Sequence, residues 1–362
     1  MKIAYNNSIF FTQKYGGISR YFCSIINEFI KSEKQVKVFS PIFKNNYLLD
    51  LPKKFRKGSY ISRYPIPLFF KNFVDYVCYT QINNSNYDIV HDTYYSENIL
   101  SYRNKKKVIT VYDLIHEKFN KLYKNKNLQL KEKIIQNSDA IICISENTKK
   151  DLLEYYKVNE KKIFVSYLGY DHISDNFSSQ SFDKLEIPNN FILFVGSRLK
   201  YKNFELFIKS YNNNKNIKND FDIVCFGGGN FSKEEIKKFD ELEIKNRVHY
   251  FEGRDNFLSY LYMKAKLFIF PSQYEGFGIP LIEAMSIGCP VLASDIDVFS
   301  EICKNGVNYF KNNDSDDLSE KLSYLLYSDT QLLSKKDLAL NISKEYSWKK
   351  CSEKTYNIYS QL

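Results

Sequence analysis

The sequence predicts an α/β protein with two Rossmann-like domains, and three observations support this prediction. Short apolar runs alternate with longer amphipathic segments along almost the whole chain, which is typical of parallel strands joined by crossover helices. About eleven strands are predicted, which is more than one open sheet usually contains. A polar stretch without periodicity at residues 171–188 separates them, and 362 residues are enough for two hydrophobic cores.

The predicted strands are short runs rich in Ile, Val, Leu and Phe. They are residues 2–5, 36–40, 88–91, 108–112, 140–144, 163–166, 191–195, 222–226, 248–251, 267–270 and 291–293. The amphipathic segments between them predict helices at residues 18–31, 129–138, 146–156, 203–211, 232–239, 256–264 and 317–327. We therefore expect a first domain at residues 1–172 and a second at residues 187–344.

The composition is that of a globular protein, with 44% hydrophobic and 26% charged residues. The longest apolar runs are far too short to span a membrane. Because the chain runs from Met1 directly into a strand, we expect no signal peptide and a cytoplasmic location. The seven cysteines are scattered without a Cys-x-x-Cys pair, so they are expected to be reduced core residues.

The net charge of +10 is compatible with three kinds of partner: nucleic acid, an anionic membrane surface or an anionic small substrate. The sequence has neither zinc-finger spacing nor an RNA-binding aromatic motif, so we expect no nucleic-acid partner. A solvated basic surface remains an alternative for much of this charge.

The most informative stretch runs from Pro271 to Val291. A buried strand leads into a glycine-rich loop and then into a short helix that Pro280 opens and Gly288 ends. Gly276 and Gly278 would allow the backbone to approach a ligand closely. The start of the helix offers unpaired N–H groups, which bind phosphate readily.

Two carboxylates, Glu275 and Glu283, would lie beside this anion site. Acidic groups repel phosphate, so they are unsuited to holding it. They are suited to accepting hydrogen bonds from hydroxyl groups on either side of a phosphate, such as a sugar at one end and a ribose at the other. This arrangement indicates a sugar nucleotide as the ligand.

Cations follow the predicted strand 191–195 and a glycine turn. Ligands of parallel sheets collect at the carboxyl ends of the strands, so Arg198 and Lys202 are placed to bind a diphosphate. A solvated basic loop explains the same residues equally well. The glycine-rich turn after strand 222–226 lacks the dinucleotide fingerprint and predicts a tight turn that lines the nucleotide site.

Two weaker signals lie in the first domain. Gly16 and Gly17 precede a helix and would permit close approach of a ligand, although most such pairs are ordinary turns. Asp113 and His116 follow strand 108–112 and would project from its end, although a histidine satisfied within a loop is an equal alternative.

The frame E-G-F-G-x-P-x-x-E-A-M-x-x-G-x-P-V around Glu275 and Glu283 resembles the donor-site signature of retaining glycosyltransferases of family 4, which have the GT-B fold. The resemblance implies two Rossmann-like domains that face each other across a cleft, with a final helix at 345–362 that crosses back to the first domain. It implies that Glu275 contacts the donor sugar and that Glu283 holds the ribose. The implied donor-loop residues are Gly276, Phe277, Gly278 and Ile279.

The resemblance extends to other candidate residues. V-G-S-R-x-x-x-K-N matches the family's phosphate-binding Arg198 and Lys202, and leaves Lys200 as a surface residue. It also implies that Gly16 and Gly17 border the donor phosphate. Asp113 and His116 are then acceptor-side or sugar-contacting residues, although Tyr112-Asp113 stands where relatives often have His-Asp. The residues expected to carry the chemistry are Glu275, Arg198, Lys202, Asp113 and His116.

The predicted function is transfer of a hexosyl group from a nucleoside-diphosphate sugar to a sugar hydroxyl of a lipid-linked or polysaccharide acceptor. Retention of configuration and independence of metal are implied by the resemblance, as is a place in bacterial lipopolysaccharide, O-antigen or capsule synthesis. Asp295-Ile-Asp297 is interpreted as a turn, and the four histidines lack metal-ligand spacing. We expect no cofactor beyond the nucleotide sugar.

Three alternatives remain. Glu275 and Glu283 could be the acid and nucleophile of a glycoside hydrolase, which would leave Arg198 and Lys202 without a purpose. A nucleotide-sugar epimerase would need a different set of acids. A non-catalytic polysaccharide-binding protein would not need the whole anion-binding frame.

Residues 53–73 combine several lysines and arginines with aromatic side chains. This chemistry suits a surface that rests on anionic lipid headgroups, so we expect it to dock the enzyme on the inner face of the cytoplasmic membrane. A loop with packed aromatic residues and solvated lysines is an equal alternative.

Overall fold

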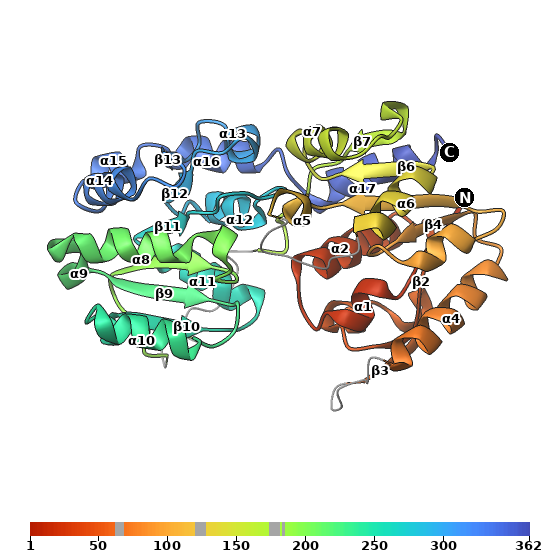
Figure 1. Cartoon of the computed structure of the whole chain (residues 1–362), viewed down its shortest axis with the longest axis horizontal. Helices are drawn as coiled ribbons and strands as arrows, with labels where there is room; N and C mark the ends of the chain where they lie inside the picture. The colour runs from red at the N-terminus through yellow and green to blue at the C-terminus, as the bar shows by residue number, and fades with distance from the viewer. Residues whose placement is uncertain (62–68, 120–127, 174–181, 183–184) are drawn as a thin grey trace. The chain divides into compact units, whose positions relative to one another are not determined.

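The computed structural model describes residues 1–61, 69–119, 128–173, 182 and 185–362. The chain divides into two compact units. Unit 1 consists of residues 1–169 and 348–362, and unit 2 of residues 170–347. Each unit contains one parallel sheet with helices between its strands, which confirms the predicted pair of α/β sheets (Figure 1).

Unit 1 contains a seven-stranded sheet. Its strands are β1 (Lys2–Tyr5), β2 (Gln35–Phe43), β3 (Arg56–Tyr60), β4 (Ile89–Asp92), β5 (Lys106–Val111), β6 (Ala140–Cys143) and β7 (Ile163–Val165). They are parallel and follow the spatial order β3-β2-β1-β4-β5-β6-β7. The strands β1, β4 and β6 are almost wholly buried, and β6 is accordingly a continuous apolar run, whereas β4 ends in His91 and Asp92.

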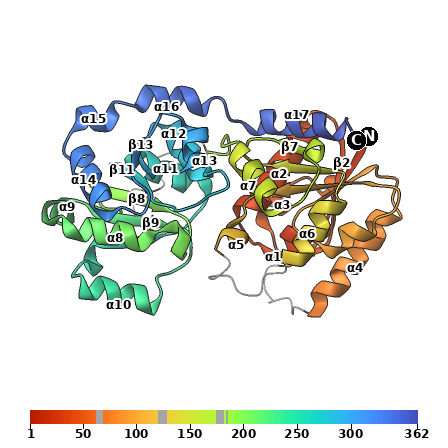
Figure 2. The same ribbon diagram turned by 45° about the horizontal axis from the view of Figure 1, so that its top comes forward.

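The helices of unit 1 include one from the far end of the chain. They are α1 (Ser8–Thr12), α2 (Gly17–Lys31), α3 (Asn46–Asp50), α4 (Phe69–Asn83), α5 (Ile115–Lys118), α6 (Leu128–Asn137), α7 (Glu146–Tyr155) and α17 (Trp348–Tyr359). The last of these packs against α2, so both termini belong to unit 1 (Figure 2). This confirms that the final helix returns to the N-terminal part of the chain.

Unit 2 contains a six-stranded parallel sheet. Its strands are β8 (Phe191–Val195), β9 (Asp222–Phe226), β10 (Val248–Phe251), β11 (Leu267–Phe270), β12 (Val291–Ser294) and β13 (Asn308–Phe310). The spatial order is β10-β9-β8-β11-β12-β13. The helices are α8 (Phe204–Asn213), α9 (Lys215–Asp220), α10 (Lys233–Glu241), α11 (Asp255–Lys264), α12 (Ile279–Ile287), α13 (Asp297–Cys303), α14 (Ser315–Leu326), α15 (Asp329–Leu333) and α16 (Lys336–Ser343).

In both sheets the strand order reverses next to the first strand of the unit. The reversal lies between β1 and β4 in unit 1 and between β8 and β11 in unit 2. At such a point the connections leave on opposite sides of the sheet, so the loops at the carboxyl ends of the two strands separate and leave room for a ligand. These two pairs of loops are therefore the first places to look for a site.

All eleven predicted strands are present, with ends shifted by at most three residues, and two further strands were missed. The missed edge strand β3 has the sequence Arg-Lys-Gly-Ser-Tyr, which has no apolar face, and the missed β13 has only three residues. The expected docking segment 53–73 is thus partly β3 and partly the start of α4, and its residues 62–68 lie outside the described part of the chain.

All seven cysteines are buried, as predicted for core residues. Among the described residues, no helix has the length and apolar character needed to cross a membrane.

Hydrogen bonds from Tyr359 hold α17 to the sheet of unit 1. Its hydroxyl lies 3.0 Å from the Tyr5 hydroxyl and 2.5 Å from Nδ1 of His91, whose Nε2 lies 2.9 Å from the Thr110 hydroxyl. Burial lowers the pKa of His91 to about 3, so its ring is neutral and needs these partners. A single phenol thus connects the last helix to two central strands.

We predict that Tyr359→Phe lowers the free energy of unfolding by about 1–3 kcal/mol, because it leaves polar atoms of His91 and Tyr5 buried without a partner. Chemical denaturation followed by circular dichroism measures this loss. The control is Tyr356→Phe on the same helix, with an expected change within about 0.5 kcal/mol. Equal effects of the two variants would contradict the prediction.

Candidate functional site

The loop before α12 has the geometry that the sequence predicted. Gly278 adopts φ 94°, and a Cβ at this position would lie 3.0 Å from Cε1 of Phe299. A glycine is therefore required here by the backbone itself. Pro280 lies in the first turn of α12, and Gly288 ends the helix with φ 74°. The start of this helix thus has a fixed place at the end of the loop that follows β11.

An ion pair joins the loops that follow β8 and β11. Nζ of Lys202 lies 2.5 Å from Oε1 of Glu275, and the two side chains are 15% and 12% exposed. The backbone N–H of Gln273 donates a hydrogen bond of 2.7 Å to the carbonyl of Tyr201, which joins the same loops a second time. Two residues 73 positions apart therefore meet where the strand order reverses.

The surroundings of this pair suit a site for an anion. Nζ of Lys202 also lies 5.2 Å from the ring centre of Phe270 and 5.4 Å from that of Tyr201. An ammonium group keeps three N–H donors, of which Glu275 takes one. A ligand phosphate could therefore bind Lys202 while the carboxylate remains available to hydroxyl groups.

The second predicted carboxylate, Glu283, is buried within unit 2 and has two protein partners. Its Oε1 lies 2.7 Å from Nε2 of His172, and its Oε2 accepts a hydrogen bond of 3.0 Å from the Tyr262 hydroxyl. The side chains of Glu283 and His172 are only 6% and 10% exposed. No local sequence pattern indicates these partners, because His172 and Tyr262 are 111 and 21 residues away.

Arg198 is held by neighbouring protein groups in this structure. Its Nε donates to Oε1 of Glu235 at 2.6 Å, and its Nη atoms donate to the carbonyls of Gly227, Gly229 and Asn230. Four of the five N–H donors of a guanidinium are thus engaged, and its carbon lies 4.8 Å from the ring centre of Phe231. In this structure the group clamps the turn after β9 and does not present a bidentate fork to a diphosphate.

The turn that Arg198 clamps packs tightly against the loop after β8. A Cβ on Gly228 would lie 2.4 Å from the carbonyl oxygen of Gly196, so this position tolerates no side chain. The sequence prediction of a tight turn at this point is correct. Its cause is the contact between two neighbouring loops of the sheet.

The predicted residues of unit 1 lie at the carboxyl edge of its sheet. Gly16 precedes the first residue of α2, and a Cβ on Gly17 would have nothing within 4 Å. Asp113 follows β5, and its Oδ1 accepts a hydrogen bond of 3.1 Å from the N–H of Ile115. His116 lies in α5. A side chain at Gly17 would therefore extend into open space.

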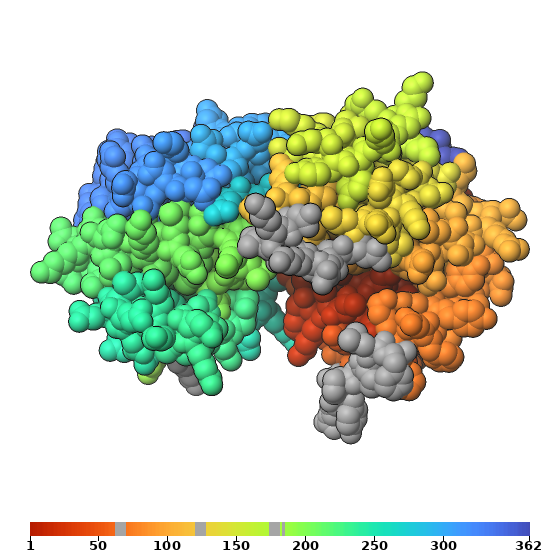
Figure 3. All heavy atoms as spheres, in the orientation of Figure 1, coloured from red at the N-terminus to blue at the C-terminus, as the bar shows by residue number. Residues whose placement is uncertain are grey.

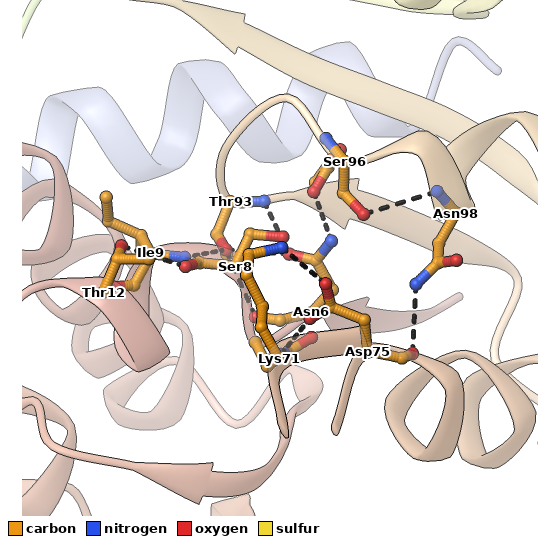
Figure 4. A network of polar contacts seen from close by, with 11 residues as sticks. Asn6, Ser8, Ile9, Thr12, Lys71, Asp75, Thr93, Ser96 and Asn98 are labelled. Carbon is orange, nitrogen blue, oxygen red and sulfur yellow. Dashed lines mark hydrogen bonds and ion pairs between the residues drawn. The ribbon is translucent and has the colours of Figure 1, made fainter. Parts of the chain in front are cut away.

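A polar network at the reversal point of unit 1 was missed by the sequence analysis (Figure 4). Nδ2 of Asn6 donates to Asp92, and Oδ1 of Asn6 accepts from the N–H and hydroxyl groups of Thr93. The N–H of Ser96 donates to Asp92 at 2.8 Å, and that of Ile9 donates to the Thr93 hydroxyl at 3.1 Å. Burial raises the pKa of Asp92 to about 7. The network fixes the loops after β1 and β4 to each other.

Within the described residues, no group of three or more His, Cys, Asp and Glu side chains is arranged to hold a metal ion. Asp295 and Asp297 are both exposed, and Asp297 is the first residue of α13.

Two family models match consecutive parts of the chain. Residues 15–173 match "Glycosyltransferase Family 4", and residues 177–339 match "Glycosyl transferases group 1". The chain belongs to the group 1 glycosyltransferases of family 4. This membership confirms the resemblance found in the sequence.

Known proteins of the family align with part of this chain. The O-antigen chain mannosyltransferase RfbU of Salmonella typhimurium is 34% identical over 178 residues, which are 48% of this chain and 47% of that protein. The N-acetylgalactosamine-N,N'-diacetylbacillosaminyl-diphospho-undecaprenol 4-alpha-N-acetylgalactosaminyltransferase of Campylobacter jejuni is 31% identical over 44% of this chain and 42% of its own. The chain thus spans about half the length of these curated relatives.

The fold of the family is also found among solved structures. HepE of Anabaena in complex with UDP superposes over 100% of both chains with a TM-score of 0.77 and 16% sequence identity. At this identity the similarity shows the fold alone, which is GT-B, with two parallel Rossmann-like sheets.

We predict that Arg198→Ala lowers the free energy of unfolding by about 2–4 kcal/mol, because it leaves Glu235 and three carbonyl groups without their donor. Urea denaturation measures the change. Lys200→Ala on the same loop is exposed and should have no measurable effect.

The opposite result for Arg198→Ala would support the diphosphate-binding role that the sequence predicts for this residue. If Arg198→Ala left stability unchanged and abolished binding of a nucleoside diphosphate, the guanidinium would have to leave the turn to bind the diphosphate.

Proposed function

We propose that the protein transfers a hexosyl group from a nucleoside-diphosphate sugar to a sugar hydroxyl, with retention of configuration. The observation that carries the proposal is the Lys202–Glu275 pair at the reversal point of the donor-type sheet, directly before the N-terminus of α12. It combines a cation and helix N–H groups for phosphate with a carboxylate for sugar hydroxyls. Family membership supports the same activity.

In this proposal the diphosphate of the donor binds Lys202 and the N-terminus of α12. These groups stabilise the negative charge that develops on the leaving diphosphate as the glycosidic bond breaks, and no metal is needed for that task. Glu275 orients the donor sugar through its hydroxyls, and Glu283 accepts hydrogen bonds from the ribose. The backbone from Gly276 to Ile279 surrounds the phosphates.

The acceptor in this proposal is a lipid-linked or polymeric glycan. Two relatives act in this way according to their names: one is an O-antigen chain mannosyltransferase, and the other uses a diphospho-undecaprenol-linked acceptor. We assign the acceptor side to unit 1, with Gly16, Gly17, Asp113 and His116 as contacts. Mannosyl donors are the first to test.

The partners of the two carboxylates argue against a glycoside hydrolase. Such an enzyme needs one protonated carboxyl group as the acid and one ionised carboxylate as the nucleophile, and neither role calls for a bound cation. Here Glu275 is paired with a cation, and Glu283 is bonded to His172 and Tyr262. The hydrolase reading would also leave the anion-binding helix start without a role.

Thermal-shift measurements with UDP-, GDP- and ADP-sugars test the donor site. We expect sugars of one of these three nucleotides to raise the Tm of the wild-type protein. Lys202→Ala and Glu283→Ala should lose that shift, because each variant lacks a contact to the nucleotide sugar. Lys200→Ala is the matched surface control and should keep the full shift. Release of nucleoside diphosphate in the presence of a glycan acceptor measures turnover. Turnover of a glycoside without any nucleotide would refute the proposal.

The charge of the protein supports a membrane-facing role for unit 1. This unit contains 31 of the 52 Lys and Arg residues but only 16 of the 42 Asp and Glu residues, which gives it a net charge of +15. Unit 2 has the remaining 21 basic and 26 acidic residues and a net charge of −5. The basic excess that could attract anionic lipid thus belongs entirely to unit 1.

Exposed aromatic side chains gather on α4 of this basic unit. Phe70, Phe73 and Tyr76 follow one another at helical spacing and are 44%, 62% and 63% exposed. The orange surface of Figure 3 includes this helix. Exposed Lys53, Lys54 and Lys57 belong to the same part of the chain. We infer that α4 places its aromatic side chains in the headgroup region of an anionic membrane, near a lipid-linked acceptor.

Vesicle flotation tests this surface. We expect the protein to bind vesicles that contain phosphatidylglycerol more tightly than vesicles of phosphatidylcholine alone, and salt to weaken the binding. Phe70→Ser with Phe73→Ser should reduce binding at least about tenfold, since each buried ring contributes on the order of 1.5–3 kcal/mol. Tyr324→Ser with Leu333→Ser, exposed residues of unit 2, is the control. Equal binding by both double variants would refute the surface.

A further inference from the structure

The partners of Glu283 suggest a role that neither the sequence motif nor the family match assigns. Its carboxylate receives one protein contact on each oxygen, from His172 at 2.7 Å and from Tyr262 at 3.0 Å. A carboxylate has about four lone-pair sites, so one site remains on each oxygen. The vicinal hydroxyls of a ribose require two such sites on neighbouring oxygens.

The two partners come from different parts of unit 2. Tyr262 lies on α11 and is fully buried, and Glu283 lies on α12. His172 belongs to the first residues of unit 2, directly after the end of unit 1 at Gly169. The carboxylate is therefore held from two sides, and its rotation about the last side-chain bond is restricted.

The phenol of Tyr262 acts on Glu283 only as a donor. Burial, with the nearby Glu283 carboxylate, raises the pKa of Tyr262 well above its ordinary value, so the hydroxyl keeps its proton. A carboxylate that accepts this proton has its plane and its free lone pairs fixed before a ligand arrives. Such preorganisation reduces the cost of ordering the group when a ligand binds.

We propose that His172 and Tyr262 are positioning residues that orient the Glu283 carboxylate toward the two hydroxyls of the donor ribose. This inference rests on the proposed nucleotide-sugar site and adds two residues to it. Neither residue touches the reacting atoms. Their contribution is to the affinity for the ribose and to the discrimination against nucleotides that lack a ribose hydroxyl.

The test compares the Kd of UDP, GDP and ADP with the Kd of their 2′-deoxy counterparts by isothermal titration calorimetry. For the nucleotide that binds the wild-type protein, we expect the deoxy form to bind about 10- to 100-fold more weakly, as for a lost hydrogen bond to a charged group. Glu283→Gln should abolish most of this ratio.

Two variants test the positioning residues themselves. Tyr262→Phe and His172→Ala should each lower the ratio by about threefold to tenfold, through weaker binding of the ribonucleotide. His172→Gln should restore part of the ratio, because its amide N–H can replace the Nε2 donor. A loss of general stability would weaken both nucleotides equally and leave the ratio unchanged.

Two other contacts, a tyrosine and a histidine that each meet a carboxylate elsewhere in the protein, provide matched controls. Tyr156 donates to Oε1 of Glu117 at 2.5 Å, and Nε2 of His249 lies 3.0 Å from Oδ2 of Asp222. Tyr156→Phe and His249→Gln should keep the wild-type ratio.

The outcomes separate the two proposals. If the wild-type protein binds none of the nucleotides, the proposed function fails and this inference fails with it. If the wild type discriminates, Glu283→Gln does not, and both Tyr262→Phe and His172→Ala keep the full ratio, the donor site stands and the positioning role is refuted.

Discussion

The Lys202–Glu275 ion pair depends on one constraint of parallel sheets, the reversal of strand order between β8 and β11. The two strands are neighbours and their connections leave on opposite sides of the sheet, and Lys202 and Glu275 join the two loops at their carboxyl ends. Burying an ion pair costs desolvation energy that mutual attraction often fails to recover. A nearly buried pair at this point is therefore better explained by the ligand it can bind than by the stability it adds.

Residues that determine the backbone conformation of the loops also shape the candidate site. Gly278 is required by its left-handed conformation and by the nearby Phe299 ring, and it also fixes where α12 begins. Arg198 holds the turn that packs against Gly196, and this contact sets the shape of the loop that carries Lys202. The geometry of the site thus follows from how three neighbouring loops pack on one another.

Much of the fold was predictable because most of the buried parallel strands are apolar runs. The spacing of Glu275 and Glu283 could be read from the sequence because both residues lie in one loop and the helix that follows it. The edge strand β3 was missed because it has no apolar face. The partners of Arg198 and Glu283 were missed for another reason. Glu235 and His172 lie 37 and 111 residues away, and no local pattern records which distant side chain a charge will meet.

The division of charge between the units changes how the net charge of +10 is understood. An anionic substrate was one of the partners that this charge suggested, yet the unit with the candidate donor site has a net charge of −5. Attraction of a nucleotide sugar to this unit cannot come from its total charge, because a net negative body repels an anion at long range. In the proposed donor site it would come from short-range contacts with Lys202 and the N-terminus of α12, which act over a few ångströms. The large positive charge of unit 1 is then free to serve a different anionic partner.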